Sequence, residues 1–414
     1  MNNKYITYSI LIILLWMPLT GIIDNLTDGS LTVWLGRLYR LLIILISFIA
    51  LTSTKWRKYL KRQTFLFISL TIYLMFIYYE TSYNIPIEAR GVDDKSFTSY
   101  TFTYVLFSFI FYITLSILLR NDSSLFDRII KRYIPMATFC NATLMGLILS
   151  KYGFIFLLTE ALNFHGVTLI IFSYEIIFTL TAIIYAWNRK IISKRNALIF
   201  VIINLLLILS MGKRGPLLSI MAVVFCIWLF KNFSIKKGLL LLSLGIILYN
   251  LFTLYISDII SIMTSINHRL GTSFAAFYYY GDLNGRELLH EYAWEQIDMN
   301  PLWGKYPGLI TPSPFLWCFG YHPHNIWIEA IMTMGYIGSI PFFILIAYIS
   351  LMKIIPALSS NSYYMFFAFL FISEVTHGFM SGTLTDSKIW MAICILYTFT
   401  NKKSIIYGKI ARQQ

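Results

Sequence analysis

The chain has 414 residues, of which 58% are hydrophobic and only 13% are charged. Because soluble domains carry about a quarter of charged residues, this composition excludes a soluble enzyme. The net charge of +14 would suit a nucleic-acid partner, but the basic residues cluster in short connections between apolar segments, as in membrane proteins. We therefore predict a single all-α, polytopic integral membrane domain over residues 1–414 and no nucleic-acid partner.

Apolar runs of roughly 20 residues, long enough to cross a hydrocarbon core of about 30 Å, recur along the chain. The first run, Tyr5–Ile23, lacks a small-residue cleavage site and is interpreted as a retained helix. We predict about twelve transmembrane helices: nine within residues 1–255, a large outer loop at 256–324, and three more helices and a tail within 325–414. The expected spans are 5–23, 32–51, 64–79, 99–119, 133–150, 167–187, 197–210, 216–231, 238–255, 325–350, 362–380 and 387–400.

The connections between these spans alternate in charge. The basic connections are 53–63, 120–132, 189–195, 231–237 and the C-terminal tail. The connections at 24–30 and 80–98 are acidic or mixed. Twelve spans place every basic connection on one side together with both termini, and the positive-inside rule assigns that side to the cytoplasm.

Two arginines, Arg37 and Arg40, lie inside the second expected span, within a few turns of its outer end. They are three residues apart and therefore share one face of a helix. The sequence leaves two interpretations open. The arginines either extend their charged ends to the outer membrane surface, or they line a path for a lipid phosphate.

The short connection SMGKRGP, residues 210–216, departs from the charge rule because it lies on the outer side and holds Lys213 and Arg214. Pro216 favours the first turn of a helix. Arg214 is therefore expected at the N-terminal start of the eighth span, where free backbone N–H groups and the helix dipole suit an anion.

The large outer loop contains a predicted amphipathic helix. In DLNGRELLHEYAWEQIDMNP, Asp282 or Asn284 can cap the helix, Arg286 falls in its first turn, and Pro301 marks its end. The apolar stripe at helical spacing is Leu288, Leu289, Tyr292, Ala293 and Ile297. We expect this helix to lie on the membrane surface.

The segment HPHNIWIEAIMTMGYIG, residues 322–338, leads from the loop into the tenth span. His324 follows Pro323 at the start of this span, where the positive end of the helix dipole disfavours the imidazolium form, and a neutral histidine is a competent general base. The alternatives are a histidine that only caps the helix and, for the H-x-H pair with His322, a metal site. No further ligand is placed convincingly, so no metal is expected. Glu329, four residues after Asn325 on the same helix face, is expected to pair with one of the arginines.

Three of these segments together resemble the O-antigen polymerase and O-antigen ligase superfamily of bacterial envelope glycosyltransferases. They are GKRG (212–215), GRELLHEYAWEQIDMNPLWGKYPG (285–308) and HPHNIWIEAIMTMGYIG (322–338). The most specific part is H-N-x-x-x-E followed by G-x-x-G after such a loop. The resemblance covers about residues 197–350, whereas the first half of the chain matches only in its apolar spans.

The resemblance implies a GT-C-like glycosyltransferase of the bacterial inner membrane that faces the periplasm, uses an undecaprenyl-pyrophosphate-linked donor and needs no metal or other cofactor. The family's arginines, which engage the donor pyrophosphate, correspond to Arg214 and Arg286. Its essential histidine corresponds to His324. The remaining residues expected to contact donor or acceptor are Lys213, His322, Asn325 and Glu329.

The acceptor stays open at this point. A polymerase transfers the glycan chain to the next lipid-linked repeat unit, and the runs at 301–308 and 323–338 favour this activity. A ligase transfers the chain to lipid A-core and is the alternative. A flippase would have similar spans but needs no outer loop that carries a base beside arginines, and transporters more often show internal repeats. Expected partners are undecaprenyl-pyrophosphate-linked oligosaccharide and polysaccharide, membrane lipid and, as a candidate, a chain-length regulator protein.

Overall fold

The computed structural model describes residues 3–28, 30–52, 94–152, 163–164, 167–211, 214–232, 243–245, 247, 250–251, 253–266, 268–280, 286–304, 323–380 and 388–399. This part of the chain is almost entirely helical, and its two short strands, β1 (Asn163–Phe164) and β2 (Val167–Thr168), form one antiparallel pair. The all-α prediction is therefore confirmed for these residues. The expected span at 64–79 lies outside them, as does half of the one at 238–255.

Most expected spans coincide with helices in the structure. The helices at expected spans are α1 (Asn3–Leu14), α2 (Trp16–Thr27), α3 (Thr32–Thr52), α5 (Asp94–Asn121), α6 (Ser124–Tyr152), α8 (Leu169–Asn188), α9 (Lys194–Ser210), α10 (Arg214–Asn232), α15 (Ile326–Ile349), α17 (Tyr364–Met380) and α18 (Ile389–Leu396). The helices outside the expected spans or at their ends are α12 (Ile256–Ile266), α13 (His268–Tyr280), α14 (Arg286–Met299), the π-helical η3 (Ser350–Ile354) and α16 (Ile355–Leu358).

The first expected span is not one straight helix. It is divided at Leu15 into α1 and α2, which meet at an angle of 62°. Pro18 explains the break, because proline cannot donate a backbone hydrogen bond to the carbonyl four residues earlier and its ring clashes with that carbonyl, here the one of Leu14.

Two helical stretches, Ser124–Lys151 and Ile326–Leu358, are each long and apolar enough to cross a membrane. The bent pair α1 and α2 would make a third span. Several further apolar helices of the described residues, α10 and α17 among them, are shorter than this criterion requires. The structure thus supports a membrane protein, and the number of twelve spans stays a prediction.

Buried polar side chains join three of the long helices in the middle of the bundle. Asn204 of α9 donates to the Thr138 hydroxyl of α6 over 3.0 Å, and Asn141 of α6 lies 3.4 Å from both Asn204 and Thr179 of α8. Within hydrocarbon, polar groups must find such partners because water is absent. These contacts fix α8 and α9 against α6, and α10 and α17 in turn pack on α8.

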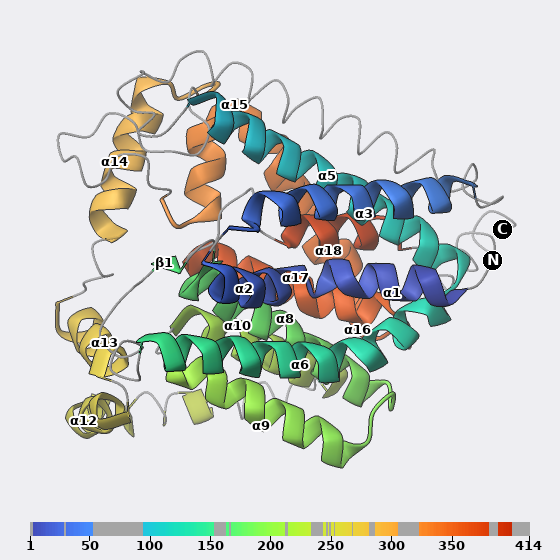
Figure 1. Ribbon diagram of the computed structural model, residues 1–414. Coiled ribbons are helices and arrows are strands. Elements are labelled where there is room, and N and C mark those ends of the chain that lie inside the picture. The colour runs from blue at the N-terminus through green and yellow to red at the C-terminus, as the bar shows by residue number, and fades with distance from the viewer. Residues whose placement is uncertain are drawn as a thin grey trace, which may run out of the picture.

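The helices run between two ends of different character. At the basic end, formed by residues 120–132, 188–195 and 353–363, Arg189 of α8 pairs with Asp127 of α6 over 2.9 Å and donates to the carbonyl of Asn361. The opposite end carries α12, α13 and α14, which gather away from the end at which α1 begins (Figure 1). The basic end matches the side that the charge pattern assigns to the cytoplasm.

Candidate functional site

His324 lies at the opposite end of the bundle in an unusual backbone conformation. Its φ angle is 52°, in the left-handed region that few residues other than glycine adopt, although histidine, asparagine and aspartate are enriched there. Non-glycine residues in this conformation cluster at functional sites. The half-buried His324 precedes the cap of α15 rather than belonging to the helix itself.

Asn325 is the N-cap of α15. Its side-chain oxygen accepts hydrogen bonds from the backbone N–H groups of Trp327 and Ile328, at 3.0 and 3.1 Å. These two N–H groups are therefore already occupied, and they are the donors that a phosphate at a helix start would use. At the start of α15 the sequence thus supplies its own acceptor, in contrast to the free N–H groups expected at the start of the eighth span.

Arg214 is the first residue of α10, as predicted, with Pro216 in the same first turn. The next residue, Gly215, packs against the hydroxyl of Tyr174 from α8 so closely that a Cβ on Gly215 would overlap it. Any side chain at position 215 would require the Tyr174 side chain to move. The start of α10 is thus in close contact with α8, while the direction of the Arg214 side chain lies outside the described residues.

Arg286 is the first residue of α14, also as predicted. The apolar stripe of this helix is confirmed at Leu289, Tyr292, Ala293 and Ile297, which are buried, whereas Leu288 is 40% exposed. The stripe packs against α15, where it forms a cluster with Ile328, Ile331 and Met332. The apolar face of α14 is therefore covered by protein, which periodicity alone does not show, and the position of α14 at the membrane surface stays a prediction.

Two glycines lock the end of α14 into a break in α15. Gly335 has φ 67° and ψ 176°, which interrupts α15, and Gly304 in the turn after α14 has φ 68°. A Cβ on Gly335 would overlap the backbone of Leu302 and Trp303, and one on Gly304 would overlap the backbone of Thr333. Both positions therefore require glycine for conformation and for space.

Hydrogen bonds complete this contact. The N–H groups of Tyr336 and Ile337, left without helical acceptors by the break, donate to the carbonyls of Pro301 and Leu302 over 2.7 and 3.0 Å. From this junction α14 packs against the first half of α15, because its buried stripe forms one cluster with Ile328, Ile331 and Met332.

A network of charged side chains lies beneath these helix starts, and no pattern in the sequence predicts it. Glu374 of α17 accepts a hydrogen bond from the backbone N–H of Lys388 over 3.0 Å, and its carboxylate lies 3.5 Å from Nδ1 of His377. The Lys388 ammonium pairs with Glu175 of α8. The ring of Tyr174, next to Glu175 in the chain, stacks on His377 with centroids 3.4 Å apart. The contacts thus close into a ring of side chains, the charged ring, made of Tyr174, Glu175, Glu374, His377 and Lys388.

The charged ring touches both candidate helix starts. On one side Tyr174 rests on Gly215, the neighbour of Arg214. On the other side Gly378, the neighbour of His377, packs so tightly against Ile326 that a Cβ on this glycine would overlap the isoleucine side chain. Both carboxylates are more than 90% buried, and buried ionisable groups at membrane depth are costly and mark functional sites by default.

The other predicted site residues divide into two groups. Glu329 is 2% exposed, one turn inside α15, and its predicted pairing with Arg214 or Arg286 stays a prediction because both arginine side chains lie outside the described residues. Lys213 and His322 also lie outside them. Among the described residues, no group of three or more histidine, cysteine, aspartate or glutamate side chains is arranged to hold a metal ion.

Arg37 and Arg40 make local contacts within α3. The Arg37 guanidinium lies over the ring of Trp34, 4.9 Å from its centroid, and Arg37 is exposed. Arg40 donates from Nε to the carbonyl of Gly36 over 3.1 Å. An exposed arginine over an exposed tryptophan is the arrangement found at membrane surfaces. These contacts favour the surface interpretation, and a role in a lipid path stays a prediction.

The second half of the chain matches a known protein family. Residues 197–343 match the family model described as O-antigen ligase, which confirms the resemblance noted in the sequence over this segment. The match includes the starts of α10, α14 and α15 and the glycine junction between the last two. No curated protein is similar enough to match the chain. The family supports an activity of the O-antigen polymerase and ligase type without distinguishing the two.

Proposed function

We propose, from the O-antigen ligase family match over residues 197–343, that the protein is an O-antigen polymerase. It would transfer a glycan from undecaprenyl pyrophosphate to the next lipid-linked repeat unit, at the end of the bundle that carries α14. The proposed site is formed by Arg214, Arg286 and His324. It is supported by one set of contacts: the charged ring touches the starts of α10 and α15, and the glycine junction joins α14 to α15.

In the proposed reaction the acceptor hydroxyl attacks the anomeric carbon of the donor sugar. The bond between that carbon and the pyrophosphate oxygen breaks, and the pyrophosphate leaves with the bonding electron pair. His324 accepts the hydroxyl proton as a neutral general base. Attack from the face opposite the leaving group inverts the anomeric carbon. Because pyrophosphate is a good leaving group, the reaction needs no strong general acid and no metal.

The two arginines have the task of holding the pyrophosphate. Arginine presents a planar fork of donors that matches phosphate oxygens, and it keeps its charge at every physiological pH. With the N–H groups at the start of α15 occupied by Asn325, the leaving group depends on Arg214, on Arg286 and on the starts of their own helices. His324 is then available to accept the proton of the acceptor hydroxyl.

The charged ring is assigned a positioning role in this site. Tyr174 sets the start of α10 through Gly215, and the stacked His377 sets the start of α15 through Gly378 and Ile326. Both contacts are made at glycines, where the side chain of the partner reaches the backbone. A shift of the charged ring therefore changes the distance between the arginines that bind the pyrophosphate and the base His324. A displacement of about 1 Å is enough to slow a reaction roughly a hundredfold.

The ligase activity is the second candidate, favoured by the description of the matching family. The lipopolysaccharide of a strain that lacks the protein separates the two. A polymerase deletion leaves core carrying a single repeat unit, and a ligase deletion leaves bare core with accumulated lipid-linked polymer. Loss of every periplasmic repeat unit would contradict both activities and indicate a flippase.

The proposed location is the bacterial inner membrane, with both termini in the cytoplasm and the site in the periplasm. Reporter fusions test it: positions 125 and 192, at the basic end, should report cytoplasm, and positions 213 and 290 should report periplasm. A cytoplasmic signal at 213 would put Arg214 and His324 on opposite sides and would refute the site. Proposed partners are the lipid-linked donor and acceptor, and a chain-length regulator protein.

A further inference from the structure

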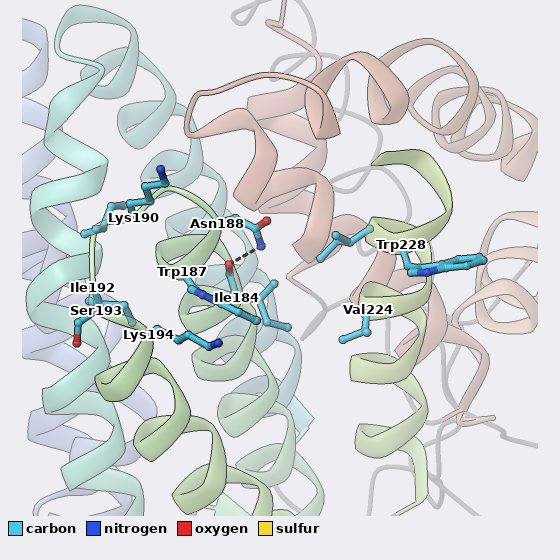
Figure 2. A pocket seen from close by; sticks show the side chains of 11 residues that line it. Ile184, Trp187, Asn188, Lys190, Ile192, Ser193, Lys194, Val224 and Trp228 are labelled. Carbon is cyan, nitrogen blue, oxygen red and sulfur yellow. Dashed lines mark hydrogen bonds between the residues drawn. The ribbon is translucent and has the colours of Figure 1, made fainter. Parts of the chain in front are cut away.

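The basic end of the bundle contains a cavity that the glycan site does not use. It measures about 790 Å³ and lies between the turn that joins α8 to α9 and the last turns of α10. Its walls combine two lysines, Lys190 and Lys194, with two tryptophans, Trp187 and Trp228 (Figure 2). Because it lies at the end of α8 opposite to Tyr174 and Glu175, it is separate from the proposed active site.

The charge of the cavity is positive. None of its described lining residues is acidic, and within the described part of the chain neither Lys190 nor Lys194 forms an ion pair. Arg189, by contrast, is neutralised by Asp127 on the far side of the turn. Ser193 adds a hydroxyl to the same wall, and in Figure 2 the Lys194 side chain runs beneath that of Trp187.

Lys190 is held at this wall by an unfavourable backbone conformation. Its φ angle is 57°, and it ends α8 with two bonds: Lys190 N–H to the Trp187 carbonyl and Ile191 N–H to the Ala186 carbonyl, at 3.0 and 2.8 Å. This is the helix ending at which glycine, or sometimes asparagine, is normally found. A lysine in such a position points to a use for its side chain rather than for its backbone.

An exposed apolar face of α10 begins at Trp228, the residue that this face shares with the lining of the cavity. Leu218, Met221, Phe225 and Trp228 follow one another at spacings of three and four residues, which places them on one helix face, and each is at least 37% exposed. Tryptophan at the headgroup level with lysines beside it is the usual composition of a membrane–water interface. An amphiphile with an anionic head at the lysines can therefore lay its apolar part on α10.

We propose that this cavity binds the headgroup of an anionic phospholipid of the cytoplasmic leaflet. Basic pockets between helices on the cytoplasmic side recognise such headgroups, and each lysine near the surface strengthens binding about fivefold. The phosphate lies against Lys194, Ser193 and Lys190, and the acyl chains follow the exposed face of α10. The proposal depends on the orientation of the bundle but not on which glycosyl acceptor the enzyme uses.

The test measures phospholipid retained by the purified full-length protein from vesicles of phosphatidylglycerol and phosphatidylcholine, by native mass spectrometry. The Lys190→Asn/Lys194→Gln variant keeps a residue that tolerates the φ of position 190. It should bind phosphatidylglycerol roughly thirtyfold more weakly, which corresponds to about 2 kcal/mol. The control Lys4→Gln/Lys131→Gln removes the same charge from exposed positions at the same end and should bind as the wild type does.

A second variant tests the space in the cavity independently of its positive charge. Val224→Trp keeps both lysines and narrows the cavity, and it should also lose phosphatidylglycerol. Equal losses in the pocket variant and in the Lys4/Lys131 control would show a general surface field and overturn the proposal. So would equal retention of the two lipids by the wild type, or full retention by Val224→Trp. Chain extension measured in the same preparations reports on the glycan site independently.

Discussion

Replacing Gly335 by alanine tests whether the glycine junction positions Arg286. Alanine at φ 67° and ψ 176° occupies a region that is essentially restricted to glycine, at a cost of about 1–3 kcal/mol. Its Cβ would also overlap the backbone of Leu302 and Trp303, and overpacking adds about 1–3 kcal/mol more. The two backbone hydrogen bonds of the junction stabilise it by only about 1–3 kcal/mol together. Residues 301–304 should therefore detach from the break in α15, because keeping the contact costs more than losing it.

The expected result is a protein that still inserts but has lost the fixed position of α14. If the released contact costs the transition state about 1.4–2.7 kcal/mol, chain extension falls roughly 10–100-fold. The assay uses purified protein with lipid-linked repeat units and follows extension, with thermal stability measured in parallel. Gly146→Ala is the matched control, because a Cβ there meets nothing within 4 Å on an exposed helix face. Extension by Gly335→Ala within twofold of this control would refute the reasoning.

Three further substitutions test the proposed roles. His324→Asn keeps a residue that tolerates a positive φ and removes the base, so extension should fall about 10²–10⁴-fold with donor binding retained; loss of both would move His324 to the anion site. Arg214→Lys keeps the charge but loses the planar fork and should recover little activity, as should Arg286→Ala, whereas full activity with lysine would show that only a positive field is needed. Lys388→Met leaves the Glu175 carboxylate buried and unpaired, so the extension rate at saturating donor should fall. In the double variant Lys388→Met/Glu175→Gln the unpaired charge is also removed, and the extension rate should fall less. Equal extension rates in the two variants would contradict the role of the pair.

How far the sequence predicts this structure depends on the range of the interactions involved. The stripe at Leu289, Tyr292 and Ile297 follows from helical periodicity, a local property, and it is confirmed. Its partner on α15 does not follow from periodicity, because an apolar face packs equally well on lipid or on protein. The charged ring was missed for the same reason: Glu175 and Lys388 are 213 residues apart, and only the packing of α17 against both α8 and α18 brings them together.

The helix starts at Arg214 and Arg286 were predictable because proline and charge patterns are local signals. The break at Gly335 was not, since a glycine inside an apolar run is compatible with a continuous helix. Gly304 lies in the expected outer loop and Gly335 in the expected tenth span. No local pattern shows that the backbones at these two positions touch.

The break in α15 also has a consequence for how the protein is made. The N–H groups of Tyr336 and Ile337 find their acceptors only on residues 301–302, which leave the ribosome earlier. If α15 entered the bilayer from the wrong side, these donors would face hydrocarbon without a carbonyl, at a cost of several kcal/mol each. The junction therefore makes one insertion direction of α15 more favourable than the other. We expect a polypeptide that begins after residue 304 to lack this preference and to insert in mixed orientations.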